Sequence, residues 1–134
     1  MKKGTNKPEH FDFDLIHSYS RKQAIEDGVL IDVSETAREA GFTFPVALTS
    51  AVYASCGKAP IDVPGQDTDG RIWDILWMLR HAIRGSSSGG SELLFRLHVQ
   101  NTEAAPPELV TLKSVCGPGD DLKPVITIMF PDED

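Results

Sequence analysis

Three polar side chains at alternate positions near the N-terminus, His17, Tyr19 and Arg21, are of the types that acid–base chemistry uses. Histidine and tyrosine can exchange a proton with a substrate, and arginine can hold an anionic group beside them. Spacing along the chain does not establish that the three side chains converge in space. Two interpretations of this weak polar cluster follow: a small enzyme of unknown reaction, or a hydrogen-bonded turn that precedes a helix.

The glycine-rich segment 117–121 is a second place where such side chains gather. Its glycines permit a tight backbone path, and the carboxylates of Asp120 and Asp121 could hold a cation or the arginine of a partner. The simpler interpretation is a hairpin turn with solvated acids. The sequence has no nucleophile elbow, no phosphate-binding glycine loop and no His-Glu-x-x-His motif. We therefore favour a protein that is not an enzyme, with no catalytic residue, metal site or cofactor.

The strongest predicted element is a helix over residues 68–84. Apolar residues recur there at spacings of one, three and four, which places them on a single stripe of roughly 100°. The stripe consists of Ile72, Ile75, Leu76, Leu79 and Ile83. We expect it to face the core of the protein.

A second sector of the same predicted helix combines tryptophan and arginine at spacings of four, three and four residues. Its members are Trp73, Trp77, Arg80 and Arg84. These two residue types supply many hot spots of protein interfaces, so the sector predicts a partner-binding surface. In the alternative interpretation, the Trp rings extend the core and the arginines reach along them to water.

The elements that must position these residues belong to a single predicted domain, residues 11–134, behind a polar tail at 1–10 that we expect to be disordered. The N-terminal half of the domain predicts short helices, each closed by a glycine. These helices are 21–26, 35–40 and 46–56, with short extended segments at 11–16 and 29–33.

The last third of the chain has β-type patterns. Segments 93–99, 109–116 and 125–130 alternate in polarity or are rich in β-branched residues, and turn-forming sequences separate them. We predict an α+β fold with short N-terminal helices, one long amphipathic helix and a C-terminal three-stranded antiparallel meander. The inner face of the meander should pack on the helix over 68–84.

Residues 34–56 raise the alternative of a DNA-binding accessory or regulatory protein. Segment 33–43 resembles the first half of a repressor-type helix-turn-helix, with Ala37 between the helices and Gly41 in the turn. The second half, 46–53, offers no Arg, Lys, Asn or Gln to contact bases. The motif is therefore degenerate, and we favour two short helices joined at Gly41 as the explanation of the pattern.

Charge and cysteine content bear on the partner and the compartment. The 134 residues include 20 acidic and 13 basic side chains, a formal net charge of −7. Such a chain is repelled by phosphate backbones, so we expect a basic or nucleic-acid-binding host protein as partner rather than nucleic acid itself. No apolar run reaches membrane-span length or follows the N-terminus as in a signal peptide. We expect a cytoplasmic protein whose two cysteines, Cys56 and Cys116, are reduced and inert.

Several segments together resemble a family of small bacterial proteins, a domain of unknown function carried on plasmids, integrative elements and phages. The segments are 13–21, 27–34, 40–42, 45–47, 70–80, 115–121 and 124–129. The resemblance implies a mobile-element setting and brings no assigned chemistry. Small acidic proteins in that setting often bind and block host machinery. The leading hypothesis is a non-enzymatic protein-binding or inhibitory factor, one that blocks a host defence complex such as CRISPR-Cas.

Overall fold

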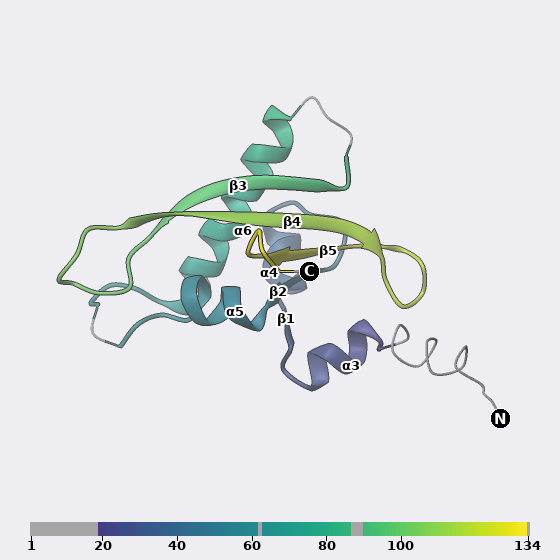
Figure 1. The fold of residues 1–134 in the computed structure, drawn as a ribbon, viewed down its shortest axis with the longest axis horizontal. Coiled ribbons are helices and arrows are strands. Elements are labelled where there is room, and N and C mark those ends of the chain that lie inside the picture. Colours follow the sequence, from purple (N-terminus) through teal and green to yellow (C-terminus); the bar gives the residue numbers. More distant parts are fainter. Residues whose placement is uncertain (1–18, 62, 87–89, 134) are drawn as a thin grey trace.

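The computed structural model describes residues 19–61, 63–86 and 90–133, which combine helices with one sheet (Figure 1). The predicted α+β class is confirmed. The predicted disordered tail 1–10, the predicted extended segment 11–16 and His17 lie outside the described residues.

The sheet has five strands in the order β1-β2-β5-β4-β3. These are β1 (Leu30–Asp32), β2 (Val46–Thr49), β3 (Glu92–Val99), β4 (Glu108–Pro118) and β5 (Pro124–Met129). Neighbouring strands are antiparallel except β2 and β5, which are parallel. The prediction of a three-stranded antiparallel sheet is wrong, because β2 and then β1 add to the free side of β5 and make the sheet mixed.

The helix predicted over residues 46–56 is wrong in its first part. Residues 46–49 are strand β2, in which the first three residues are fully buried, and the chain turns into helix α5 (Ser50–Val52) only afterwards. A π-helical turn, η1 (Tyr53–Gly57), completes the segment. Val46 and Thr49 are β-branched and suit a strand, and pairing with β5 gives this short segment the partner that a strand needs. The helix-turn-helix arrangement expected at 34–56 is therefore not formed, because its second helix is a central strand.

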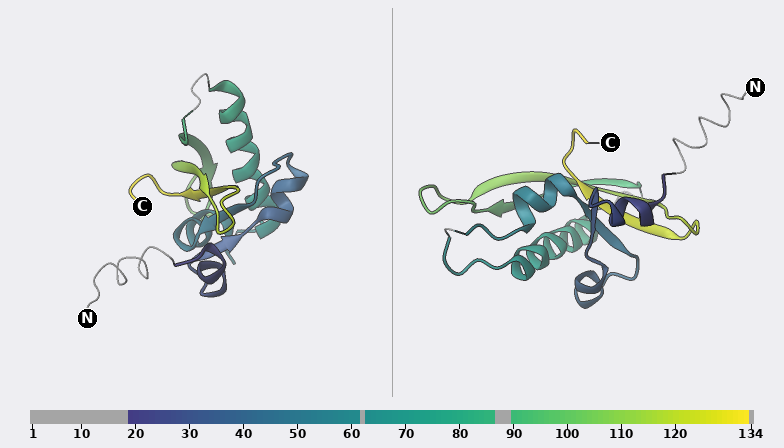
Figure 2. Two further views of the ribbon diagram at one scale, coloured as in Figure 1. Left: turned by 90° about the vertical axis from the view of Figure 1, so that its right-hand side faces the viewer. Right: turned by 90° about the horizontal axis from the view of Figure 1, so that it is seen from below.

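Helices cover the two faces of the sheet unequally (Figure 2). On the inner face lie α4 (Ser34–Glu39), α5, η1 and α6 (Thr68–Gly85). On the outer face lie α3 (Arg21–Glu26) and the turn at the C-terminus. The core fills the space between the inner face and α6. Its largest fully buried side chains are Val46, Leu48, Val52, Ile75, Leu76, Leu79, Leu112 and Ile128.

Helix α6 is 18 residues long and begins at a side-chain cap, because the carboxylate of Asp67 accepts a hydrogen bond from the Gly70 amide at 2.6 Å. Its buried stripe differs from the predicted one at both ends. Arg71 is only 6% exposed and belongs to the stripe, whereas Ile83 is 45% exposed. The exposure of Ile83 arises because the last turns of α6 project beyond the edge strand β3 (Figure 1). Within the described part of the chain, no helix is long and apolar enough to cross a bilayer.

Candidate functional site

The two tryptophans of the predicted partner-binding sector of α6 form a row of three contacting rings together with His81. The rings of Trp73 and Trp77 stack nearly parallel, with centroids 5.9 Å apart and an angle of 13° between their planes. His81 meets Trp77 edge-on at 5.4 Å and 79°. The spacing of four residues places the three side chains on one face of the helix. We call Trp73, Trp77 and His81 the α6 ladder.

Exposure differs along the α6 ladder. Trp73 is half-buried and packs against the core, as the alternative interpretation of the Trp rings expects. Trp77 is 41% exposed, and its neighbour Met78 is 38% exposed. The ladder therefore holds one large aromatic ring in a fixed position while leaving much of it open to solvent.

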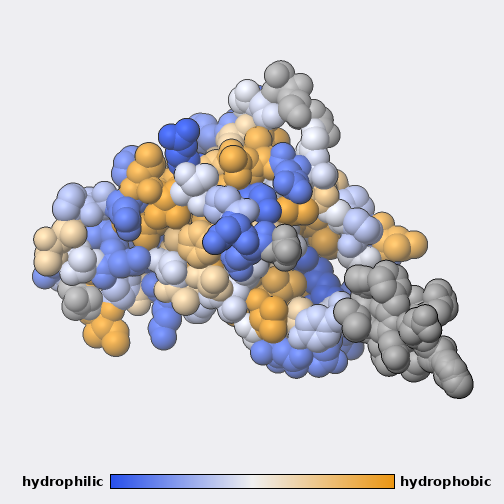
Figure 3. Space-filling model, in the orientation of Figure 1, coloured by the Kyte–Doolittle hydropathy of each residue, from blue (hydrophilic) through white to orange (hydrophobic). Residues whose placement is uncertain are grey.

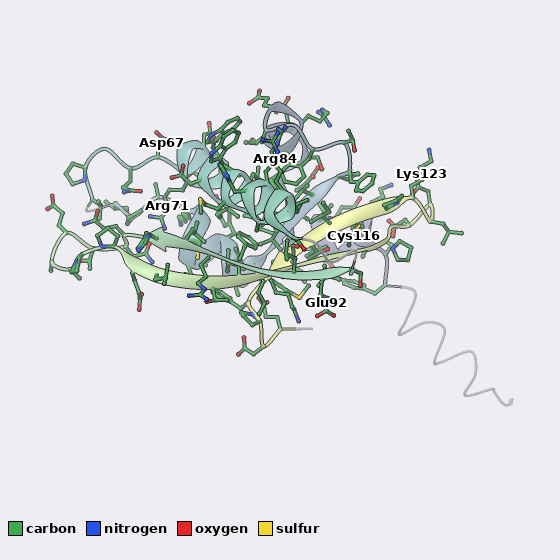
Figure 4. All side chains as sticks on the ribbon, turned by 90° about the horizontal axis from the view of Figure 1, so that it is seen from above. Asp67, Arg71, Arg84, Glu92, Cys116 and Lys123 are labelled. Atoms are coloured by element: carbon green, nitrogen blue, oxygen red, sulfur yellow. The ribbon has the colours of Figure 1, made fainter. Side chains whose placement is uncertain are left out.

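The two arginines of the predicted sector separate in the structure. Arg84 is exposed at the last turn of α6 (Figure 4). Arg80 instead donates a hydrogen bond from Nη1 to the carbonyl oxygen of Ala40, at the end of α4. Its guanidinium lies against Gly41, where a Cβ atom would overlap it. Arg80 therefore links α6 to the end of α4, and this hydrogen bond engages its guanidinium within the chain.

On the outer face of the sheet, the predicted loop meets two members of the weak polar cluster, Tyr19 and Arg21. Tyr19, Arg21 and Asp120 all line one groove of about 990 Å3, bounded by α3, β1, the β4–β5 hairpin and the C-terminal turn. Asp120 accepts hydrogen bonds from the backbone amides of Arg21 and Lys22, at 2.8 and 3.0 Å. Asp121 instead accepts from the amide of Lys123, which closes the hairpin turn.

The polar side chains of this groove are already engaged with the protein. The Arg21 guanidinium donates to Thr127 Oγ1 and to the Ile126 carbonyl, both at 2.7 Å. The Tyr19 hydroxyl donates to Asp27 at 2.7 Å, and this hydrogen bond raises the pKa of Tyr19. A phenol is protonated at neutral pH even at its ordinary pKa of about 10, and the raised pKa of Tyr19 makes it a still weaker acid. In the described residues, no group of three metal-ligating side chains gathers at this or another place.

Comparison with known proteins places the chain in a family. The model of a family of unknown function, DUF6573, matches residues 9–134. The chain belongs to the DUF6573 family. No curated protein and no solved structure matches this sequence.

Among the described residues of this DUF6573 chain, Arg71 is a buried charge that the sequence pattern did not predict. The guanidinium of Arg71 reaches from α6 to η1 and to the end of β3 (Figure 4). It donates to four oxygen atoms at 2.7–3.3 Å. The acceptors are the carbonyls of Ser55, Cys56 and Gln100 and Oδ1 of Asn101. The sequence signal that could have predicted this burial is its spacing, because Arg71 lies four residues before Ile75 and eight before Leu79 on the same helix face.

Both cysteines of this DUF6573 chain are free thiols. Cys56 is buried in the core beneath Arg71, and burial raises the pKa of its thiol while the nearby guanidinium of Arg71 opposes that shift. A thiol with a raised pKa carries little thiolate at neutral pH and reacts slowly. The geometry therefore fits the predicted inert thiol at Cys56.

Proposed function

We propose that this DUF6573 protein is a non-enzymatic protein-binding factor whose docking surface is the α6 ladder. One observation carries the proposal: Trp77 is 41% exposed although Trp73 stacks on one of its faces and His81 contacts its edge. Large aromatic side chains that are held rigid before binding lose little conformational entropy when a partner covers them. They are the side chains that most often dominate binding energy at interfaces.

Acidic side chains near the α6 ladder favour a basic partner. Asp74, on the same helix between the two tryptophans, is exposed. Helix α4 packs beside α6 and exposes two acids, Glu35 and Glu39, and one base, Arg38. These carboxylates and the net charge of −7 would attract a basic or nucleic-acid-binding protein and repel nucleic acid itself.

We further propose that binding is inhibitory, in the mobile-element setting that the family resemblance implies. A partner whose basic surface normally contacts nucleic acid loses access to it when an acidic protein covers that surface. A host defence complex such as CRISPR-Cas is a partner of this kind, with a basic surface that contacts nucleic acid. The proposal predicts a stoichiometric complex and no turnover of a substrate.

The experiment compares capture of partners from host lysate by the full chain and by two matched variants. Trp77→Ala removes the exposed ring of the ladder, and Leu109→Ala removes another exposed apolar side chain, 51% exposed, on the opposite face. We expect a stoichiometric partner that the wild type and Leu109→Ala recover and Trp77→Ala loses. A partner retained by Trp77→Ala places the docking surface elsewhere, and recovery of no stoichiometric partner counts against the function.

The enzymatic hypothesis retains one specific observation, the shared groove of Tyr19, Arg21 and Asp120. Their hydrogen bonds to Asp27, Thr127 and the α3 amides leave the groove better suited to stabilising α3 than to proton transfer.

DNA binding also stays a prediction. A gel shift at about 50 mM salt, where electrostatic binding is strongest, tests it directly.

A further inference from the structure

The two edges of the sheet differ in length and in protection. β1 has three residues, whereas β3 runs for eight residues without proline, glycine or lysine. Natural sheets keep their edges short or protect them with charged side chains, above all lysine, with proline or with a covering element, because unpaired backbone groups recruit another strand. Among the described residues, no strand pairs with the free side of β3.

The pairing of β3 with β4 determines which backbone groups point to that free side. The Cys116 amide donates to the Ser91 carbonyl at 2.8 Å, so these two opposite residues form a hydrogen-bonded pair. Along two antiparallel strands, hydrogen-bonded pairs of residues alternate with non-hydrogen-bonded pairs. Glu92, Leu94 and Arg96 therefore direct their amide and carbonyl groups away from β4. Their side chains are exposed on the outer face.

We propose that β3 pairs antiparallel with β3 of a second copy of this chain, across a two-fold axis at Leu94. In this register Glu92 lies opposite Arg96 of the second copy, twice by symmetry, and Leu94 lies opposite its own equivalent. Opposite charges and apolar side chains at facing positions stabilise a strand pair. Leu94 is 59% exposed in the single chain, and apolar and hydrophilic side chains mix over β3 and β4 (Figure 3).

The charges select this register over its neighbours. Moving the axis by one residue places Glu92 opposite His98 and Leu94 opposite Arg96, which removes both oppositely charged pairs. Moving it by two residues toward Val99 places the two Arg96 side chains opposite each other, a repulsive arrangement. The strand is self-complementary about Leu94.

Helix α6 supplies a second, independent observation. Ile83 continues the core-facing stripe of Leu76 and Leu79, yet it is 45% exposed because the helix projects past β3 (Figure 1). Figure 4 looks onto this edge, with β3 in front and α6 beside it. Neighbouring strands lie about 4.8 Å apart, so a strand added to β3 extends the sheet over the last turns of α6. The second copy thereby covers an apolar side chain that the single chain leaves in solvent.

Charge reversal tests the register on the full chain. We expect light scattering to give the mass of a dimer for the wild type. Glu92→Arg and Arg96→Glu should each weaken the dimer at least about tenfold, because each places like charges opposite one another. The double variant restores opposite charges and should restore the dimer. Arg38→Glu, an exposed arginine on α4, is the matched control and should leave the dimer unchanged.

Cross-linking tests the position of the axis. Cα atoms in a hydrogen-bonded antiparallel pair lie about 5.5 Å apart, within the range that a disulfide spans. Leu94→Cys should therefore link two copies under mild oxidation, whereas His98→Cys should not. Both variants change exposed side chains, and circular dichroism verifies that each is folded.

A wild-type mass of one chain at every concentration overturns the proposal, as does a dimer that the single charge reversals leave intact or that the double variant fails to restore. The outcome is independent of the α6 ladder. Trp77→Ala should retain the dimer, and Arg96→Glu should retain whatever partner the ladder captures.

Discussion

The carboxylate of Asp120, in the turn between β4 and β5, accepts a hydrogen bond from the backbone amide of Arg21 at 2.8 Å, although 99 residues separate them. The second oxygen of the same carboxylate accepts from the next amide, that of Lys22. Ser20 accepts from the Gln23 amide, so the first three amides of α3 all have side-chain partners. The hairpin thus supplies the part of the helix cap that α3 cannot supply from its own sequence.

Removal of this carboxylate should destabilise the attachment of α3. Asp120→Ala leaves two helix amides without a side-chain acceptor, and we expect the free energy of unfolding to fall. Asp121→Ala, in the same turn, is the control and should cost less, since Asp121 accepts only the Lys123 amide. Urea unfolding measures both variants, and equal losses would contradict the assignment of the cap to Asp120.

The contribution of Asp120 should depend on pH. Hydrogen bonds from the Lys22 and Arg21 amides hold the pKa of this carboxyl below its ordinary value in the folded protein. The unfolded carboxyl has a pKa of about 3.9, so the stabilisation is fully present above that pH and disappears as the pH falls through the folded pKa. The stability difference between wild type and Asp120→Ala should be constant near neutrality and shrink in acid. A difference that grows as the pH falls has the wrong sign for this cap.

Replacement of the buried arginine by lysine should be costly despite the conserved charge. Arg71 donates to four oxygen atoms on η1, on Asn101 and on the residue after β3. A lysine has three donors on one nitrogen and cannot span these positions. We expect Arg71→Lys to lose about 2 kcal/mol in urea unfolding, because carbonyls become unsatisfied. Arg84→Lys, at an exposed position of the same helix, should change stability little.

Gly41 should not tolerate a side chain. Its backbone has φ of +102°, and a Cβ atom there would overlap the Arg80 guanidinium. Gly41→Ala combines backbone strain with loss of the Arg80 hydrogen bond to Ala40, and we expect a loss of about 2 kcal/mol. Gly28→Ala, with φ of +77° and open space around it, has the strain without the overlap and should lose less. Thermal unfolding of the two variants separates these contributions.

Tryptophan fluorescence reports directly on the α6 ladder, because the only two tryptophans of the chain are Trp73 and Trp77. Trp73→Phe leaves the exposed ring as the sole emitter, and acrylamide should quench it strongly. Trp77→Phe leaves the half-buried ring, which should be quenched less. Equal quenching in the two variants would contradict the difference in exposure on which the proposed docking surface depends.

Local patterns in the sequence determined the elements whose signals lie within a few residues. The spacing of Ile72 and Leu79 predicts the core-facing side of α6, and polar alternation predicts β3. Caps and glycines such as Ser20 and Gly28 delimit α3. These features depend on helix and strand periods and on turn geometry, which neighbouring residues define among themselves.

Only the tertiary structure decided which distant segments meet. Residues 46–49 become a strand because β5 offers them a pairing partner, and Arg80 leaves the predicted surface because Ala40 offers an acceptor. Asp120 becomes a cap for a helix at the other end of the chain. A pairing or hydrogen-bond partner that lies far away in sequence leaves no periodic trace in the segment that uses it. A single sequence therefore shows each partner separately, and only the folded chain shows which two meet.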